Sequence, residues 1–176
     1  MNSRIHQLLL SGLFAALTAI CSWLNIMLFF TPVPINMALL APYLSGLLLG
    51  SRYAVLSQII YVLMGVIGIP VFAGFTTGLG VIMGPTGGFI AGYIICAAVC
   101  GLPFRKKGTK HRILLMLAGL MSCYAFGLIW FMYVTEASLW AGLISCVLPF
   151  LPGDAVKIAV AALLAKYMTP ALKGLE

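Results

Sequence analysis

The sequence predicts an all-α membrane protein with six transmembrane helices, and three observations lead to this class. Of the 176 residues, 63% are hydrophobic and only 7% are charged, whereas about a quarter of the residues of soluble domains are charged. Apolar segments that approach the roughly 20 residues needed to cross a bilayer recur along the chain. The basic residues gather between alternate pairs of these segments, as membrane topology requires. We expect a single integral membrane domain, residues 1–176.

Prolines, glycines and charged residues delimit the six predicted spans. The first apolar run is too long for the hydrophobic region of a signal peptide. It ends before residues 31–34, because the two prolines there lack a backbone donor and disfavour helix in the residues before them. The second span is short for a full crossing. The predicted spans are residues 8–30, 35–50, 53–69, 85–104, 113–134 and 152–168, with a shorter apolar segment at 137–148.

Residues 72–84 form a glycine-rich loop that carries no charge. Irregular backbone is tolerated at membrane depth only where it is buried in protein or lines a cavity. The loop lacks the Lys-Ser/Thr pair of a phosphate-binding P-loop and the strand and helix flanks of a Rossmann fingerprint. We therefore predict an outer loop that lines a cavity and no hydrolysis of ATP by this chain alone.

The basic residues predict the topology. If the N-terminus is cytoplasmic, the predicted outer loops contain no Lys or Arg, which satisfies the positive-inside rule. The C-terminus is then cytoplasmic too, and Trp23, Trp130 and Trp140 fall toward the outer side. The net charge of +7 therefore reflects topology, and we expect no nucleic-acid binding, because no basic stripe alternates with stacking aromatic residues. Nine of the ten basic residues fall on the inner side: Arg4, Arg52, Arg105, Lys106, Lys107, Lys110, Arg112, Lys166 and Lys173.

The tenth basic residue, Lys157, follows Asp154 by three positions at the start of the last span. This spacing places both side chains on one face of a helix. An ionisable residue inside a membrane costs about 2.5–3.5 kcal/mol and usually has a partner or a function. Two simpler interpretations are that Asp154 caps the helix and that Lys157 extends to the outer interface. We favour a ligand site, because pockets for polar ligands place a few donors and acceptors in an apolar wall.

Catalytic and metal chemistry receive little support. The five cysteines are scattered, and we predict that they pack as small hydrophobic residues; metal or redox chemistry at Cys96 and Cys100, which share a helix face, is the alternative. His6 and His111 are expected at solvated helix ends, without a nucleophile nearby. We predict no cofactor, no metal and no catalytic residue. The small-residue series at 84, 88 and 92 predicts close packing of helices.

Five motifs, which occur in the same order over nearly the whole chain, resemble the BioY family. This family comprises the biotin-specific S components of energy-coupling factor (ECF) transporters. Asn36 stands where the family pattern leads us to expect Thr. The motifs are residues 32–35 (Pro-Val-Pro-Ile), 46–50 (Gly-Leu-Leu-Leu-Gly), 68–74 (Gly-Ile-Pro-Val-Phe-Ala-Gly), 84–89 (Gly-Pro-Thr-Gly-Gly-Phe) and 151–157 (Leu-Pro-Gly-Asp-Ala-Val-Lys).

The resemblance implies an ECF S-component-like fold in the bacterial cytoplasmic membrane. It implies that the protein captures biotin from the outside with high affinity. It also implies a transmembrane coupling subunit and two cytoplasmic ATPase subunits as partners, besides membrane lipid. The predicted substrate-binding residues are Asp154, Lys157, Gly74, Phe75, Thr77, Gly78, Asn36 and Tyr93. Small residues of the first span resemble the family's contact with the coupling subunit, and two registers fit: Gly12 with Ala16, and Ala15 with Ala19.

Three other functions remain open on the sequence. The first is an S component or a solitary transporter for another small vitamin or heterocycle. The second is an intramembrane enzyme, and the third is a structural scaffold. The enzyme would need a nucleophile or a metal cluster. The scaffold would have no outer cavity.

Overall fold

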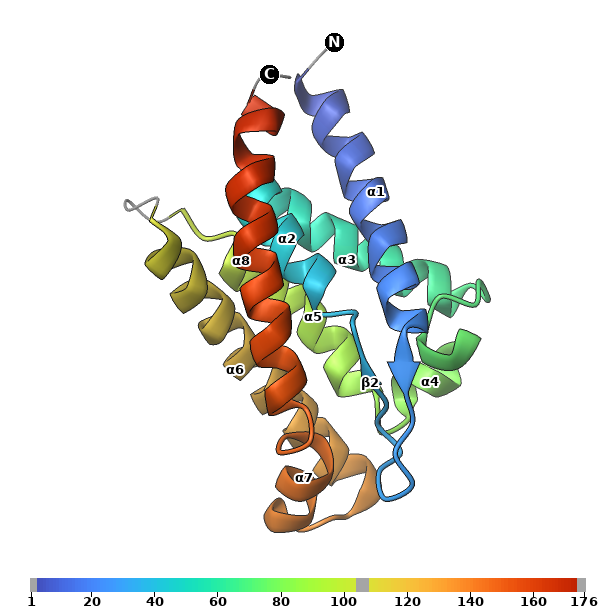
Figure 1. Ribbon diagram of the computed structural model, residues 1–176. Coiled ribbons are helices and arrows are strands. Elements are labelled where there is room, and N and C mark those ends of the chain that lie inside the picture. Colours follow the sequence, from blue (N-terminus) through green and yellow to red (C-terminus); the bar gives the residue numbers. More distant parts are fainter. Residues whose placement is uncertain (1–2, 104–107, 174–176) are drawn as a thin grey trace.

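The computed structural model describes residues 3–103 and 108–173. The N-terminal end of α1 and the C-terminal end of α8 lie at one end of the molecule, and the β1–β2 hairpin and α7 lie at the other, here called the hairpin end (Figure 1). The elements in chain order are α1 (Ser3–Trp23), β1 (Asn25–Ile26), β2 (Ile35–Asn36), α2 (Leu40–Leu49), α3 (Ser51–Val66), a 3₁₀ turn (Ala73–Phe75), α4 (Leu79–Met83), α5 (Gly87–Cys100), α6 (Thr109–Thr135), α7 (Leu139–Cys146) and α8 (Leu151–Lys173).

The described residues fold mainly into apolar helices, which confirms the all-α membrane fold. Two helices, Arg4–Trp23 and Thr109–Thr135, are long and apolar enough to cross a membrane alone. A third span consists of Leu139–Cys146 and Leu151–Thr169, which meet at an angle of 50°. The shorter apolar helices are α2, α3 and α5. A ten-residue helix such as α2 rises only about 15 Å, so irregular backbone must continue the shorter helices toward the membrane surface.

The predicted first span, residues 8–30, extends too far, because α1 ends at Trp23. Asn25 and Ile26 pair antiparallel with Asn36 and Ile35, so these residues take extended conformation on both sides of the turn at residues 31–34. The Asn25 side-chain amide donates to the carbonyl of Trp23 at 3.0 Å and satisfies a carbonyl that the end of the helix leaves free. For the same reason α2 begins at Leu40, not at residue 35.

Helix α5 packs closely against α6. A Cβ atom added at Gly92 would lie 2.8 Å from Cys123 Sγ, and one added at Gly88 would lie 2.3 Å from Cβ of Trp130. These contacts confirm the packing role predicted for this glycine series. At Gly84 the neighbouring α6 instead makes a hydrogen bond, from the Trp130 indole to the carbonyl oxygen at 3.0 Å.

All five cysteines are buried, as predicted, and Cys96 Sγ lies 4.0 Å from Cys100 Sγ. Among the described residues, no group of three or more His, Cys, Asp or Glu side chains is arranged to hold a metal ion. His6 and His111 are half-buried rather than solvated. The predicted basic loop falls partly on residues 105–107, which lie outside the described residues.

Candidate functional site

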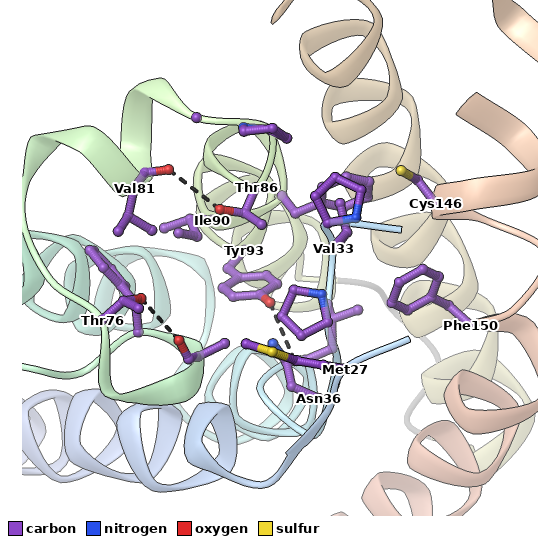
Figure 2. A pocket seen from close by; sticks show the side chains of 18 of the residues that line it. Met27, Val33, Asn36, Thr76, Val81, Thr86, Ile90, Tyr93, Cys146 and Phe150 are labelled. Carbon is purple, nitrogen blue, oxygen red and sulfur yellow. Dashed lines mark hydrogen bonds between the residues drawn. The ribbon is translucent and has the colours of Figure 1, made fainter. Parts of the chain in front are cut away.

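A cavity of about 270 Å³ opens at the hairpin end of the molecule. Its walls come from the β1–β2 hairpin, from the loop between α3 and α5, and from the helices α5, α6 and α8. Figure 2 shows that side chains of the hairpin, among them Val33 and Asn36, lie between those of α5 and those near the start of α8. A small-molecule site of this kind is typically apolar with a few placed polar groups.

The polar part of the cavity is a buried cluster of three side chains on α6 and α8. Lys157 Nζ donates to Asp154 Oδ1 at 2.6 Å, and the Tyr124 hydroxyl donates to Asp154 Oδ2. Asp154 and Lys157 are only 1% and 3% exposed, yet both line the cavity. The two charges are therefore paired and desolvated, which is the arrangement that makes a charge tolerable inside a membrane.

This geometry contradicts one of the two simpler interpretations of the pair, that Lys157 extends to the outer interface. Asp154 lies in the first turn of α8, but its carboxylate accepts from side chains of Tyr124 and Lys157. Lys157 does not extend to the interface, because its ammonium is held inside the protein. Both residues line the cavity.

Asn36 and Tyr93 supply a second polar pair in the cavity (Figure 2). The Asn36 side-chain oxygen accepts from the backbone N–H of Ala38 at 3.0 Å and from the Tyr93 hydroxyl at 3.5 Å. The first bond orients the side chain and leaves its NH₂ group as the donor that a ligand can meet. The structure thus brings four predicted residues together: Asn36, Tyr93, Asp154 and Lys157.

The other four predicted residues lie in the loop after α3 but do not line the cavity. Phe75 stacks on Trp23, with ring centroids 5.0 Å apart, and Thr77 donates to the carbonyl of Gly65 at 2.9 Å. Gly74 and Gly78 have φ angles of +67° and +92°, which glycine adopts at little cost. These four residues belong to the loop without lining the cavity, whereas their neighbours Phe72, Ala73 and Thr76 line it.

Sequence reasoning missed several residues that line the cavity, of which Tyr124 is the most important. It lies 30 residues before Asp154 on another helix, and no local pattern marks it. Tyr61 and Phe72 were also missed; their rings meet edge to face at 5.6 Å. A buried tyrosine usually finds a partner for its hydroxyl, and the only available signal was the position of Tyr124 in a span that has to face the charge pair.

The two registers of small residues on α1 differ in exposure. Ala15 and Ala19 are 0% and 4% exposed and belong to the core, so they are not available for direct contact with a partner. Gly12 and Ala16 are exposed, and a Cβ added at Gly12 would meet no atom within 4 Å. Of the two registers, that of Gly12 and Ala16 is therefore the exposed one.

Comparison with known proteins places the chain among transporters. The model of the BioY family matches residues 1–174. The biotin transporter BioY of Thermotoga maritima is 36% identical over 165 residues, which cover 92% of this chain and 94% of the relative. The probable biotin transporter BioY of Pyrococcus horikoshii is 37% identical over 163 residues, which cover 93% and 96%.

A solved structure shares the fold. The crystal structure of the S-component for biotin from an ECF-type ABC transporter matches with a TM-score of 0.88. The match covers 95% of this chain and 92% of the other at 24% identity. Likeness at this identity shows a shared fold.

Proposed function

This chain belongs to the BioY family, and on that premise we propose that it captures biotin in the cell membrane as the S component of an ECF-type transporter. The relatives named as biotin transporters cover more than nine-tenths of the chain. The observation that carries the proposal is the buried Asp154–Lys157 ion pair, which lines a mostly apolar cavity at the hairpin end. The family consists of transporters, and the protein is not an enzyme.

The chemistry of the cavity suits biotin. The ureido ring of biotin offers two N–H donors and one carbonyl acceptor, and its side chain ends in a carboxylate. Asp154 is an acceptor, Lys157 has ammonium protons besides the one directed at Asp154, and Asn36 has a free NH₂ group. The aromatic side chains of Phe72, Tyr61 and Phe89 provide the apolar surface for the fused ring and the hydrocarbon chain.

We further propose that the hairpin end faces the outside of a bacterial cytoplasmic membrane and that both termini are cytoplasmic. Arg4 lies in the first turn of α1, Lys110 and Arg112 lie in the first turn of α6, and Lys166 lies near the end of α8. These ends of the three helices lie opposite the hairpin (Figure 1). Trp23 ends α1 and Trp140 belongs to α7, so these aromatic residues lie at the outer interface. Both distributions follow the usual pattern of membrane proteins.

The proposed partners are a transmembrane coupling subunit and two cytoplasmic ATPase subunits. This chain has no phosphate-binding motif of its own, and we assign ATP hydrolysis to the two cytoplasmic subunits. The exposed face at Gly12 and Ala16 allows close approach of a partner helix, as small residues do in lipid. We assign the coupling contact to this register.

A binding titration of the purified protein with biotin tests the proposed site. Asp154→Ala and Lys157→Ala should each weaken biotin binding by far more than tenfold, because each removes a placed polar group and leaves the other charge buried without its partner. Lys166→Ala is the matched control, since this lysine is on the same helix but exposed. An affinity that stays within tenfold of the wild type, about 1.4 kcal/mol, in both site variants contradicts the proposal, and stronger binding of a competing vitamin reassigns the ligand.

A further inference from the structure

The C-terminal end of α1 is fastened to residues 70–76, here called the wall segment. The Ser22 hydroxyl donates to the carbonyl of Val71, and the Trp23 indole N–H donates to the carbonyl of Pro70 at 2.9 Å. The Trp23 ring also stacks on Phe75 at 5.0 Å. Phe75 has a φ angle of +58°, a strained conformation for a bulky residue that persists only where the surroundings hold it. Neither Ser22 nor Trp23 lines the cavity.

The wall segment determines where the aromatic side chains of the cavity stand. Phe72 is 1% exposed, and its ring fills a notch over Gly65, where an added Cβ would come within 2.0 Å of it. The Phe72 ring meets Tyr61 edge to face at 5.6 Å, and Tyr61 in turn meets Tyr93 at 6.5 Å. A displacement of the wall segment would therefore shift three rings that line the cavity.

Ser22 is the last of three buried hydroxyls on one face of α1. Ser11, Thr18 and Ser22 are spaced by seven and four residues, which aligns them on a helix. Ser11 donates to the carbonyl of Tyr53 at 3.1 Å, and Thr18 accepts from the side-chain amide of Gln58 at 3.2 Å. Both of these bonds hold α1 to α3. The Ser22 hydroxyl, which also donates to the carbonyl of Ala19 at 2.9 Å, bonds to the wall segment instead.

We propose that Ser22 and Trp23 are positioning residues for ligand retention: through their bonds to Pro70 and Val71 they hold the wall segment against the cavity. A bound ligand is then retained partly by residues that it never touches. The identity of the ligand rests on the function proposed above. The mechanical link itself rests on the hydrogen bonds and ring contacts of α1.

The experiment compares the double variant Ser22→Ala/Trp23→Phe with the wild type. Phenylalanine keeps an aromatic ring against Phe75 but lacks the indole donor. The rate of biotin dissociation from purified protein should rise about fivefold to twentyfold, while the association rate changes by less than threefold. Ser11→Ala is the matched control, since it removes a hydroxyl bond between α1 and α3 but none to the wall segment; its dissociation rate should stay within twofold of the wild type.

Amide hydrogen exchange without ligand provides a second, independent measurement. The N–H groups of Phe72 and Gly78 bond to the carbonyls of Thr76 and Gly65, so they should exchange at least threefold faster in the double variant and at the wild-type rate in Ser11→Ala. Unchanged exchange and unchanged dissociation in the double variant would overturn the proposal. So would equal acceleration in Ser11→Ala, which would indicate general loosening. If the wild type binds no biotin, the proposed function fails, and the exchange comparison still decides the role of Ser22 and Trp23.

Discussion

The cavity has two unlike walls. The wall on α6 and α8 is regular helix and carries the charged side chains Asp154 and Lys157 together with Tyr124. The opposite wall, built from the wall segment and the β1–β2 hairpin, is irregular backbone, carries no charge, and contributes Phe72, Val33 and other apolar surface. Both walls are nonetheless held by hydrogen bonds inside the protein.

The difference separates two tasks. Helices restrict the orientations of their side chains, so a buried charge pair placed on them keeps its geometry. Such a pair can bind the polar groups of a ligand. Irregular backbone adapts its shape to the ligand, but in a membrane it must be covered or line a cavity. Changes to the helical wall should therefore cost stability and binding together, whereas changes to the loop wall should act through the shape of the cavity.

Lys157→Met is the change with the largest expected effect on the helical wall. It leaves the Asp154 carboxylate buried with the Tyr124 hydroxyl but without its cation, and breaking a buried pair in this way costs about 3–5 kcal/mol. We expect a clear fall in the midpoint of thermal unfolding in detergent and no measurable biotin binding.

The double variant Asp154→Asn/Lys157→Met separates stability from recognition. It removes both charges, so most of the lost thermal stability should return, while biotin binding stays absent. Recovery of binding in the double variant would show that the pair is structural and does not contact the ligand.

Tyr124→Phe should have an intermediate effect. It deletes one hydrogen bond to a buried carboxylate, and such bonds to charged groups contribute about 1.5–3 kcal/mol. A titration should show biotin affinity reduced by about tenfold, with the fold retained. Tyr133→Phe on the same helix is the control, because Tyr133 is 79% exposed and its hydroxyl should not influence the cavity; equal affinities in the two variants would count against a role for Tyr124.

Gly65→Ala should have the smallest effect on stability and should act on the loop wall. The new methyl group would meet the Phe72 ring, and overpacking of this kind costs about 1–3 kcal/mol. The ring has to move toward the cavity, so biotin affinity should fall severalfold. Gly12→Ala, where nothing lies within 4 Å, should leave thermal stability unchanged or slightly higher because alanine favours helix. If Gly65→Ala has the same thermal stability as Gly12→Ala, the Phe72 ring is not tightly packed against Gly65.

The sequence was sufficient for features that depend on hydropathy and charge. The predicted spans follow from apolar runs, and the pairing of Asp154 with Lys157 follows from helical spacing. The end of α1 at Trp23 was missed because residues 24–30 are apolar enough to continue a helix; only their pairing with residues 35 and 36 makes them extended.

The irregular wall was predictable as a region but not residue by residue. Composition pointed to residues 72–84, yet which side chains face the cavity depends on the positive φ angles at Gly74 and Phe75. Tyr124 was out of reach for a different reason. Its contact with Asp154 joins two helices, and the sequence of either helix alone carries no sign of the other.

The neutrality of the Asp154–Lys157 pair has an electrical consequence. A single elementary charge carried across a membrane potential of 100 mV exchanges about 2.3 kcal/mol with the field. Lys157 and Asp154 sit 2.6 Å apart and would travel as a compact dipole of no net charge. The pair itself therefore adds almost no work against the membrane voltage when the depth of the site within the bilayer changes.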